Sequence, residues 1–373
     1  MPEASERLIA IFIPNLRGGG AERVMVTLAN HFVTSGHRVD LVLGRATGEY
    51  LDEVSPDVRV IDLRTDRMLT CLLPLIRYLR RERPAVMLSA LNHVNIIAIL
   101  ARKFAGVQMR LVISERNSLT SLGKSHAGKL LKRLMAWFYP SADAVIAVTQ
   151  AGVKELINTF GLSKEKVYAI PNPVDIERLQ ALSVVPLNHP WFDTGAPPVI
   201  LAVGRLSPQK DFGTLIQAFA QLRMQLQFPA RLVILGEGPL RETLQRQVEE
   251  LGVQSDVYMP GFRENPFNWM ARSQLFVLSS LYEGFPNVLV QAMACGARVI
   301  STNCPTGPDE ILEGGLWGRL VEPGNFRDLA LAMSMSLKDT TSPDVRQRVR
   351  SFQFGEIASI YFSVLVSSVS EGE

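Results

Sequence analysis

A glycine and two cations follow a short apolar run in the second half of the chain. Gly204, Arg205 and Lys210 come after the run 199–203, and Pro208 lies between the two cations. The run is typical of a buried parallel strand, and an amphipathic helical pattern follows Lys210. Close backbone approach at a glycine, an arginine fork, a lysine point charge and the N–H groups of a helix start favour phosphate binding. A strand-to-helix loop with two solvated cations is the alternative.

A carboxylate follows another apolar run of the same half. Glu283 lies between the run 275–278 and a helical pattern over 288–295. Gly284 and Phe285 are expected to present backbone N–H groups where that helix begins. We therefore predict that Glu283 projects toward a ligand at the end of its strand. A carboxylate that caps the helix is a second interpretation.

The first half contains a glycine-rich loop of its own. The segment RGGGAER over 17–23 includes Gly19 and Gly20, which allow close backbone approach to an anion or a sugar at a helix start. It resembles a dinucleotide fingerprint, but Arg23 stands in place of the third glycine. Residues 43–45 also lack the acidic group that would end the second strand. A dinucleotide site is therefore disfavoured, and a plain turn is another interpretation.

Apolar runs of strand length alternate with helical patterns along the chain. They form two series, one over 8–13, 38–43, 58–61, 86–88, 110–113, 144–148 and 167–170 and the other over 199–203, 231–235, 257–259, 275–278 and 298–301. Such alternation predicts parallel sheets in an α/β architecture with two doubly wound domains. The proline-rich stretch 171–198 separates the two series. Ligands bind at the carboxyl ends of strands in such domains, where the motifs above fall.

Composition limits the class of protein. The 373 residues are 47% hydrophobic, and no apolar run reaches the roughly 18 residues that a membrane-spanning helix needs. The polar start MPEASER predicts no secretory signal, and three scattered cysteines predict neither a disulfide framework nor a metal cluster. Residues 1–185 hold 24 Lys and Arg against 17 Asp and Glu, whereas the remainder holds 15 against 19. We therefore expect a cytoplasmic protein whose two halves meet different partners.

Six motifs occur in a characteristic order: GGGAER, IPNPVD, VGRLSPQKDF, ILGEGPL, SSLYEGFPNVLVQAMACG and PTGPDEIL. Through these motifs nearly the whole chain resembles the retaining family-4 glycosyltransferases of the GT-B fold, especially bacterial members that build lipid-linked oligosaccharides or envelope polysaccharides. The resemblance implies two Rossmann-like domains facing a central cleft, with acceptor binding over 1–185 and nucleotide-sugar binding over 186–350. It also implies that residues 351–373 form a helix that returns to the first domain.

The resemblance assigns roles to the cations and carboxylate of the second half. Arg205 and Lys210 match the pair that holds the donor diphosphate, and Glu283 matches the first carboxylate of an E-x7-E motif that contacts the donor sugar. Gln291 stands where the second carboxylate usually binds the ribose hydroxyls. An amide lacks that charge, so we predict weaker nucleotide binding than is usual in the family. The other expected donor contacts are Gly204, Gly236, Gly238, Gly284, Phe285, Pro286 and Asn287.

Contacts to the acceptor or the sugar are expected from strand ends of the first half. These residues are Gly19, Gly20, His93, Glu115, Arg116 and Asn117. Many relatives carry histidines in this region, and a structural role for His93 is an equal alternative.

No metal or other cofactor is expected. The sequence contains no Asp-x-Asp pair and no His, Cys and Asp cluster with ligand spacing. Arg205, Lys210 and helix N-terminal amides would then neutralise the diphosphate leaving group. Retention, which the resemblance implies, would follow from front-face attack in which a donor phosphate oxygen takes the acceptor proton.

Two basic segments with interleaved apolar and aromatic residues, 76–83 and 124–139, indicate an anionic membrane surface as a partner. Ordinary surface helices with apolar faces in the core are the alternative. The segments and the basic first half favour a peripheral position on the inner face of the cell membrane and a lipid-diphosphate acceptor. Nucleic acid is not an expected partner, because no reader module is recognisable.

The sequence therefore predicts a retaining, metal-independent glycosyltransferase that moves a hexose or N-acetylhexosamine from a nucleotide-diphosphate donor, with UDP favoured. The expected acceptor is a glycan on a polyprenyl diphosphate, used in envelope polysaccharide or glycoprotein glycan synthesis. A nucleotide-sugar-binding protein with little transferase activity is the alternative that Gln291 raises. An NAD(P)-dependent oxidoreductase is less favoured.

Overall fold

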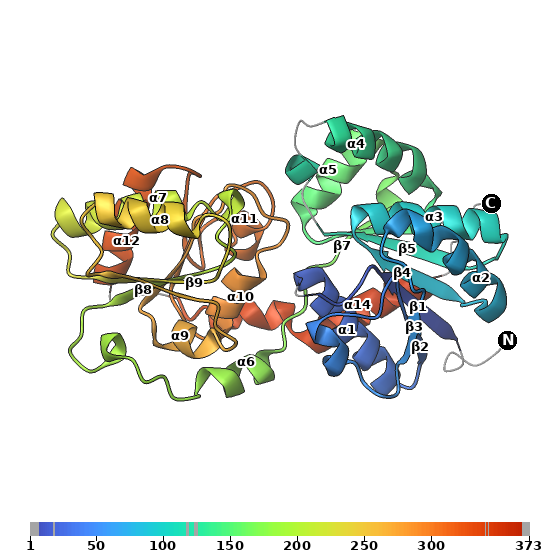
Figure 1. Ribbon diagram of the computed structural model, residues 1–373, viewed down its shortest axis with the longest axis horizontal. Helices are drawn as coiled ribbons and strands as arrows, with labels where there is room; N and C mark the ends of the chain where they lie inside the picture. The colour runs from blue at the N-terminus through green and yellow to red at the C-terminus, as the bar shows by residue number, and fades with distance from the viewer. Residues whose placement is uncertain are drawn as a thin grey trace. The chain divides into compact units, whose positions relative to one another are not determined.

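The computed structural model describes residues 7–17, 19–116, 119–122, 126–339, 341 and 343–367. The chain forms two compact units (Figure 1). The first contains the described residues up to Pro173 and again from Gly355 onward, and the second is Val174–Phe354. In this described part, no helix combines the length and apolar character that a membrane crossing requires.

The first unit is built on a seven-stranded sheet of order β3-β2-β1-β4-β5-β6-β7, in which every pairing is parallel. The strand order reverses between β1 and β4, which makes the sheet doubly wound as predicted. The strands are β1 (Leu8–Ile13), β2 (Arg38–Leu43), β3 (Arg59–Asp62), β4 (Val86–Ala90), β5 (Arg110–Glu115), β6 (Ala144–Ala147) and β7 (Val167–Ala169).

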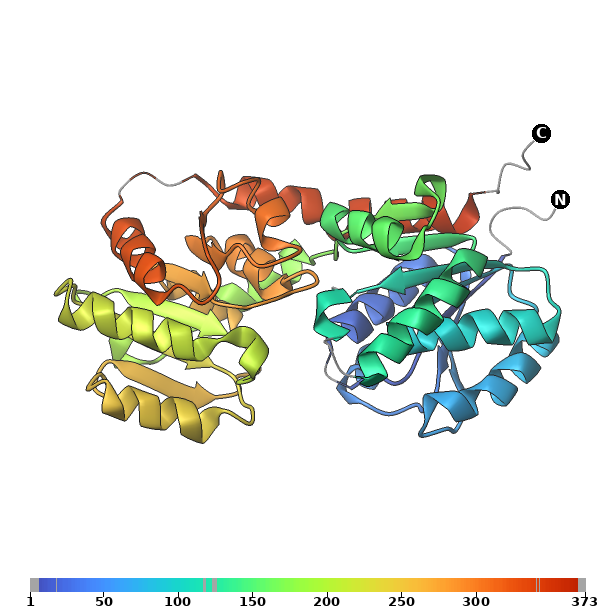
Figure 2. The ribbon, with the colours of Figure 1, turned by 90° about the horizontal axis from the view of Figure 1, so that it is seen from above.

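Helices cover both faces of this sheet, since central strands such as β1 and β4 are buried along their whole length and almost entirely apolar. The helices are α1 (Gly20–Thr34), α2 (Leu72–Glu82), α3 (Asn92–Ala105), α4 (His126–Phe138), α5 (Gln150–Phe160) and α14 (Phe354–Val366). Leu75, Ile97 and Met135 join α2, α3 and α4 in one core on one face. Helices α1 and α14 lie on the opposite face (Figure 1 and Figure 2).

The second unit has a six-stranded parallel sheet of order β10-β9-β8-β11-β12-β13, which reverses between β8 and β11. The strands are β8 (Val199–Val203), β9 (Arg231–Leu235), β10 (Val257–Gly261), β11 (Leu275–Leu278), β12 (Val299–Thr302) and β13 (Arg319–Val321). The helices are α6 (Ile176–Ser183), α7 (Phe212–Met224), α8 (Arg241–Glu250), α9 (Phe267–Arg272), α10 (Asn287–Ala294), α11 (Pro308–Ile311), α12 (Phe326–Lys338) and α13 (Arg346–Val349). The two sheets agree with the predicted fold class.

The first unit ends at Pro173, earlier than the boundary at 185 expected from the sequence. Helix α6 belongs to the second unit because it packs on α9. Asn265, just before α9, donates through its Nδ2 to the carbonyl oxygen of Leu182 at 2.9 Å. The proline-rich stretch after α6 is therefore part of the second unit.

The chain returns to the first unit between Phe354 and Gly355, close to the expected position 350. The returning segment pairs with the outgoing one through a hydrogen bond of 2.8 Å from the backbone N–H of Val174 to the carbonyl oxygen of Phe352. The expected C-terminal helix is α14, and its Tyr361 is fully buried.

All three cysteines are buried free thiols. Burial raises the pKa of Cys71 and raises the pKa of Cys295 to about 12. Burial, with the negative charge of Glu283, raises the pKa of Cys304 to about 11. Because the thiolate is the reactive form, we expect Ellman's reagent at pH 8 to react far more slowly with the native protein than with the urea-unfolded protein. Equal rates would contradict this packing.

Candidate active site

Lys210 and Glu283 form an ion pair at the carboxyl edge of the second sheet. The Nζ atom of Lys210 lies 2.6 Å from Oε1 of Glu283, and the two side chains are only 14% and 8% exposed. Lys210 ends a short 3-10 turn after β8, and Glu283 follows β11. Because β8 and β11 are neighbours in a parallel sheet, their carboxyl ends bring these distant residues together.

Three further side chains fix the Glu283 segment. The Ser280 hydroxyl donates to Oε1 of Glu283 at 2.6 Å, and Gln209 Nε2 lies 3.4 Å from Oε2. The Thr306 hydroxyl donates to the main-chain oxygen of Glu283. Helix α10 begins after Pro286 without any side-chain cap. Glu283 is therefore not a helix cap, and its contact with a ligand stays a prediction.

The turn that contains Lys210 is hydrogen-bonded to the segment that follows β11. The Ser279 hydroxyl donates to the carbonyl oxygen of Lys210 at 2.7 Å. The N–H of Leu281 donates to the carbonyl oxygen of Gln209 at 2.9 Å. Asp211 follows with a left-handed φ of 45° and caps α7, accepting a hydrogen bond from the N–H of Thr214. The ammonium group is therefore held in place by its backbone as well as by Glu283.

Arg205 lies in the loop between β8 and Lys210 and, unlike the ion pair, is exposed. Its side chain is exposed and has no hydrogen-bond or ion-pair partner among the described residues. A Cβ atom at Gly204 would lie 3.3 Å from Cε of Lys210, so the glycine makes room for the lysine stem. The site thus offers one unpaired guanidinium and one paired ammonium to an anion.

The glycines after β9 serve the packing of two loops. A Cβ atom at Gly236, where φ is +140°, would lie 1.9 Å from the carbonyl oxygen of Gly204. A Cβ atom at Gly238 would lie 2.4 Å from the carbonyl oxygen of Leu206. Side chains at either position would separate the loop after β9 from the loop that contains Arg205. Their donor contact stays a prediction, but their role in shaping the site is clear.

The start of α10 supplies the remaining predicted donor contacts. Phe285 is buried, with its ring 5.7 Å from that of Phe352, so this residue can offer a ligand only its backbone. Pro286 and Asn287 follow at the helix start. Gln291 lies one turn further along, half-buried, and its side chain has no hydrogen-bond partner within the described part of the chain.

The predicted contacts Glu115 and Arg116 lie at the end of β5 inside the first unit. They are 4% and 7% exposed. The Tyr139 hydroxyl donates to Oε2 of Glu115 at 2.8 Å, and burial together with this carboxylate raises the pKa of Tyr139. Arg116 donates to the Tyr361 hydroxyl at 3.1 Å and to the side-chain oxygen of Asn172. Both residues therefore stabilise their own unit, and their acceptor contact stays a prediction.

The other residues predicted in the first unit, Gly19, Gly20 and His93, form no hydrogen bond or ion pair with one another in the described structure. Gly19 precedes α1 and Gly20 begins it; a Cβ atom at Gly19 would collide with the Glu22 carboxylate. His93 is exposed near the start of α3, with Nδ1 3.2 Å from the side-chain oxygen of Asn92. Asn117 lies outside the described residues.

Acidic, histidine and cysteine side chains do not gather in the described residues into a group of three or more that could hold a metal ion. The residues that sequence reasoning missed are Gln209, Ser279, Ser280 and Thr306, which orient Lys210 and Glu283. The two consecutive serines directly after a predicted strand could have indicated the roles of Ser279 and Ser280.

Solved glycosyltransferases share this arrangement of two doubly wound units. The structure of Anabaena Alr3699/HepE in complex with UDP and glucose superposes with a TM-score of 0.79 at 22% identity, covering 97% of this chain and 100% of that one. The apo form of the lipopolysaccharide outer core galactosyltransferase WaaB gives a TM-score of 0.76 at 21% identity, covering 96% and 98%. The fold is therefore GT-B, as predicted.

Sequence comparison defines the family. The model for glycosyl transferases group 1 matches residues 192–351, and the model for Glycosyltransferase Family 4 matches residues 18–178. The N-acetylgalactosamine-N,N'-diacetylbacillosaminyl-diphospho-undecaprenol 4-alpha-N-acetylgalactosaminyltransferase of Campylobacter jejuni is 30% identical over 89% of this chain and 90% of its own length. The amylovoran biosynthesis glycosyltransferase AmsD of Erwinia amylovora is 26% identical over 79% of this chain and 80% of its own length. This chain belongs to the family-4 glycosyltransferases.

Proposed function

We propose that this protein is a retaining, metal-independent glycosyltransferase that moves a hexose or N-acetylhexosamine from UDP to a polyprenyl-diphosphate-linked saccharide. The observation that carries the proposal is the ion pair of Lys210 and Glu283 at the carboxyl edge of the second sheet, with Arg205 exposed in the loop that leads to Lys210. The UDP in the HepE complex supports the donor class. The diphospho-undecaprenol substrate named for the Campylobacter jejuni relative supports the acceptor class.

In this proposal Arg205 and Lys210 bind the diphosphate of the donor. Arg205 is exposed and unpaired within the described residues, so it can take up phosphate oxygens without breaking a contact. Lys210 has two further N–H groups beyond the one that Glu283 accepts. Glu283 then accepts hydrogen bonds from hydroxyl groups of the donor sugar while Ser280 and Gln209 keep it in place.

The transfer step breaks the bond between the anomeric carbon and the diphosphate oxygen. A new bond forms between that carbon and the acceptor hydroxyl oxygen on the same face, so the configuration is retained. The acceptor proton passes to an oxygen of the leaving diphosphate, and no protein base is required. Negative charge grows on the diphosphate as the bond breaks, and the two cations stabilise it in the role that a divalent ion has elsewhere.

The proposal is tested with separate UDP-hexoses and UDP-N-acetylhexosamines, a short-chain polyprenyl-diphosphate saccharide and excess EDTA. We expect one donor to give a product with an axial anomeric linkage by NMR, at a rate that added Mg²⁺ does not change. An inverted product, or loss of transfer in EDTA that Mg²⁺ restores, would contradict the mechanism. Tight UDP binding without any product would favour the alternative of a nucleotide-sugar-binding protein.

Gln291→Glu is expected to tighten UDP binding by about 1–2 kcal/mol, or roughly 5- to 30-fold. A carboxylate would accept charge-assisted hydrogen bonds from the ribose hydroxyls, which the amide cannot match. Calorimetric titration with UDP measures the change. Gln225→Glu, at the exposed end of α7, is the matched control because it alters the net charge equally. An affinity that rises in neither variant would show that Gln291 does not contact the nucleotide.

We further propose that the protein works at an anionic membrane surface. Helix α4 exposes Leu130 and Trp137, which are 58% and 82% exposed, together with the cations Lys129 and Arg133. Residues 124 and 125 of the predicted basic segment lie outside the described residues. We expect co-sedimentation with phosphatidylglycerol-containing vesicles at low salt and release at high salt, since salt screens the attraction. Protein that stays in the supernatant at low salt would contradict this.

A further inference from the structure

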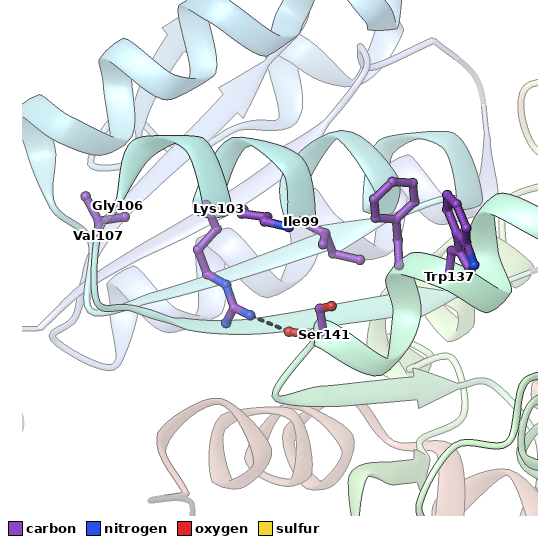
Figure 3. Close-up of a pocket in the computed structure, with 8 residues that line it drawn as sticks. Ile99, Lys103, Gly106, Val107, Trp137 and Ser141 are labelled. Atoms are coloured by element: carbon purple, nitrogen blue, oxygen red, sulfur yellow. Dashed lines mark hydrogen bonds between the residues drawn. The ribbon is translucent and has the colours of Figure 1, made fainter.

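A groove of about 760 Å³ lies in the first unit between α3 and the segment from the end of α4 to β6 (Figure 3). Ile99, Lys103 and Val107 line it from the side of α3, and Trp137, Phe138 and Ser141 line it from the facing segment. The volume is within the range of about 300–1,000 Å³ typical of small-ligand pockets. None of these residues belongs to the donor site.

One aromatic ring that lines the groove is unusually exposed. Trp137 is 82% exposed, whereas Ile99 is buried. An indole that stays this exposed at the edge of an apolar groove is typical of surfaces that meet a membrane interface. The groove therefore favours an occupant with an apolar body.

The charged side chains of the groove indicate the charge of the occupant's polar group. Arg102 donates to the Asp143 carboxylate and to the Ser141 carbonyl oxygen, so its charge is already neutralised. Lys103 is exposed and has no ion-pair partner among the described residues. Helices α3 and α4 together contain five Lys and Arg and no Asp or Glu. An anionic group is therefore attracted to Lys103, which lies between Val107 and Ile99 along the groove (Figure 3).

We propose that this groove binds one hydrocarbon chain of an anionic membrane phospholipid, with the lipid phosphate beside Lys103. The chain runs from Lys103 toward Ile99 and Trp137. Burial of a chain adds an apolar contribution to the electrostatic attraction of the two helices, and stable membrane attachment generally needs two such signals. The inference rests on the membrane part of the proposed function and adds a defined lipid site to it.

The test uses phosphatidylcholine vesicles with phosphatidylglycerol whose chains carry bromine, which quenches nearby indoles. The Trp137 contribution is the difference between the wild type and Trp137→Phe. We expect strong quenching in the wild type and its loss in Ser141→Phe, which fills the groove from an exposed position. Ser163→Phe, also exposed in the first unit, is the matched control and keeps the quenching. Thermal melts verify that each variant folds.

A second pair of variants tests the phosphate end. Lys103→Gln is expected to weaken vesicle binding about fivefold. Lys166→Gln removes an equal charge from an exposed position outside the two helices and is expected to change binding less. Quenching that persists in Ser141→Phe, or equal effects of the two lysine variants, would overturn the proposal. The proposal would also be overturned if the wild-type protein did not bind vesicles and instead formed a dimer that Trp137→Phe dissociates.

Transfer to a short-chain, water-soluble acceptor separates this inference from the proposed function. We expect Ser141→Phe to retain that transfer, because the acceptor does not occupy the groove. Absence of transfer in the wild type, combined with bromolipid quenching that Ser141→Phe abolishes, would contradict the proposed function while supporting the lipid site.

Discussion

Lys210→Ala is expected to lower sugar transfer by about 100-fold or more. The substitution removes a cation fixed at the strand edge, and loss of one preorganised group that stabilises developing negative charge typically costs this much. The loss should appear both in the KM for the donor and in kcat, because Lys210 binds the diphosphate and also stabilises the charge that grows on it in the transition state. Initial rates over a range of donor concentrations measure it.

The control for Lys210→Ala must separate chemistry from stability. Removing Lys210 leaves Glu283 buried without its counter-ion, which destabilises a protein by about 3–5 kcal/mol in comparable pairs. The double variant Lys210→Ala with Glu283→Gln is therefore expected to recover melting temperature but not activity. Lys164→Ala, at an exposed position of the first unit, is a neutral comparison. Activity of Lys210→Ala within a few-fold of the wild type would contradict its role at the diphosphate.

Glu283→Gln is expected to lower transfer by roughly 10- to 150-fold, the equivalent of about 1.5–3 kcal/mol for hydrogen bonds to a charged group. The amide keeps the size of the side chain but loses the charge that pairs with Lys210 and would accept from sugar hydroxyls. Affinity for UDP alone is expected to change less than transfer, because UDP lacks the sugar.

Comparing the change in UDP affinity with the change in transfer rate tests this prediction directly. If Glu283 only orients Lys210, UDP affinity and transfer should fall together in Glu283→Gln. If Glu283 contacts the sugar, transfer should fall much further than UDP affinity. An unchanged transfer rate would show that Glu283 does not act in the donor site.

The strands of the fold were the most predictable elements. The expected runs at 8–13, 38–43, 199–203 and 231–235 coincide with β1, β2, β8 and β9, because buried parallel strands are continuous apolar runs. Strand β13 was missed, since this half-buried edge strand of three residues follows a glycine-rich loop and has no apolar run. The start of α6 in the second unit was also unpredictable, because it depends on contacts with α9 far along the chain.

Within the candidate site, residue types were predictable but partners were not. Lys210 and Glu283 were placed at strand ends, yet their ion pair depends on β8 and β11 being neighbours in the sheet. Arg116 was expected to face a substrate, and its bond to Tyr361 joins residues 245 positions apart. Periodicity and spacing describe local structure and do not specify such pairings.

The most direct test of the central claim is a thermal-shift panel of UDP, GDP, ADP, CMP and NAD(H) on the wild type and Lys210→Ala. A ligand at about 100 times its Kd adds about 2.7 kcal/mol, which shifts the melting temperature by several degrees. We predict that UDP stabilises the wild type and that the shift is lost in Lys210→Ala. Stabilisation by NAD(H) alone, or an equal UDP shift in the variant, would contradict a diphosphate site at Lys210.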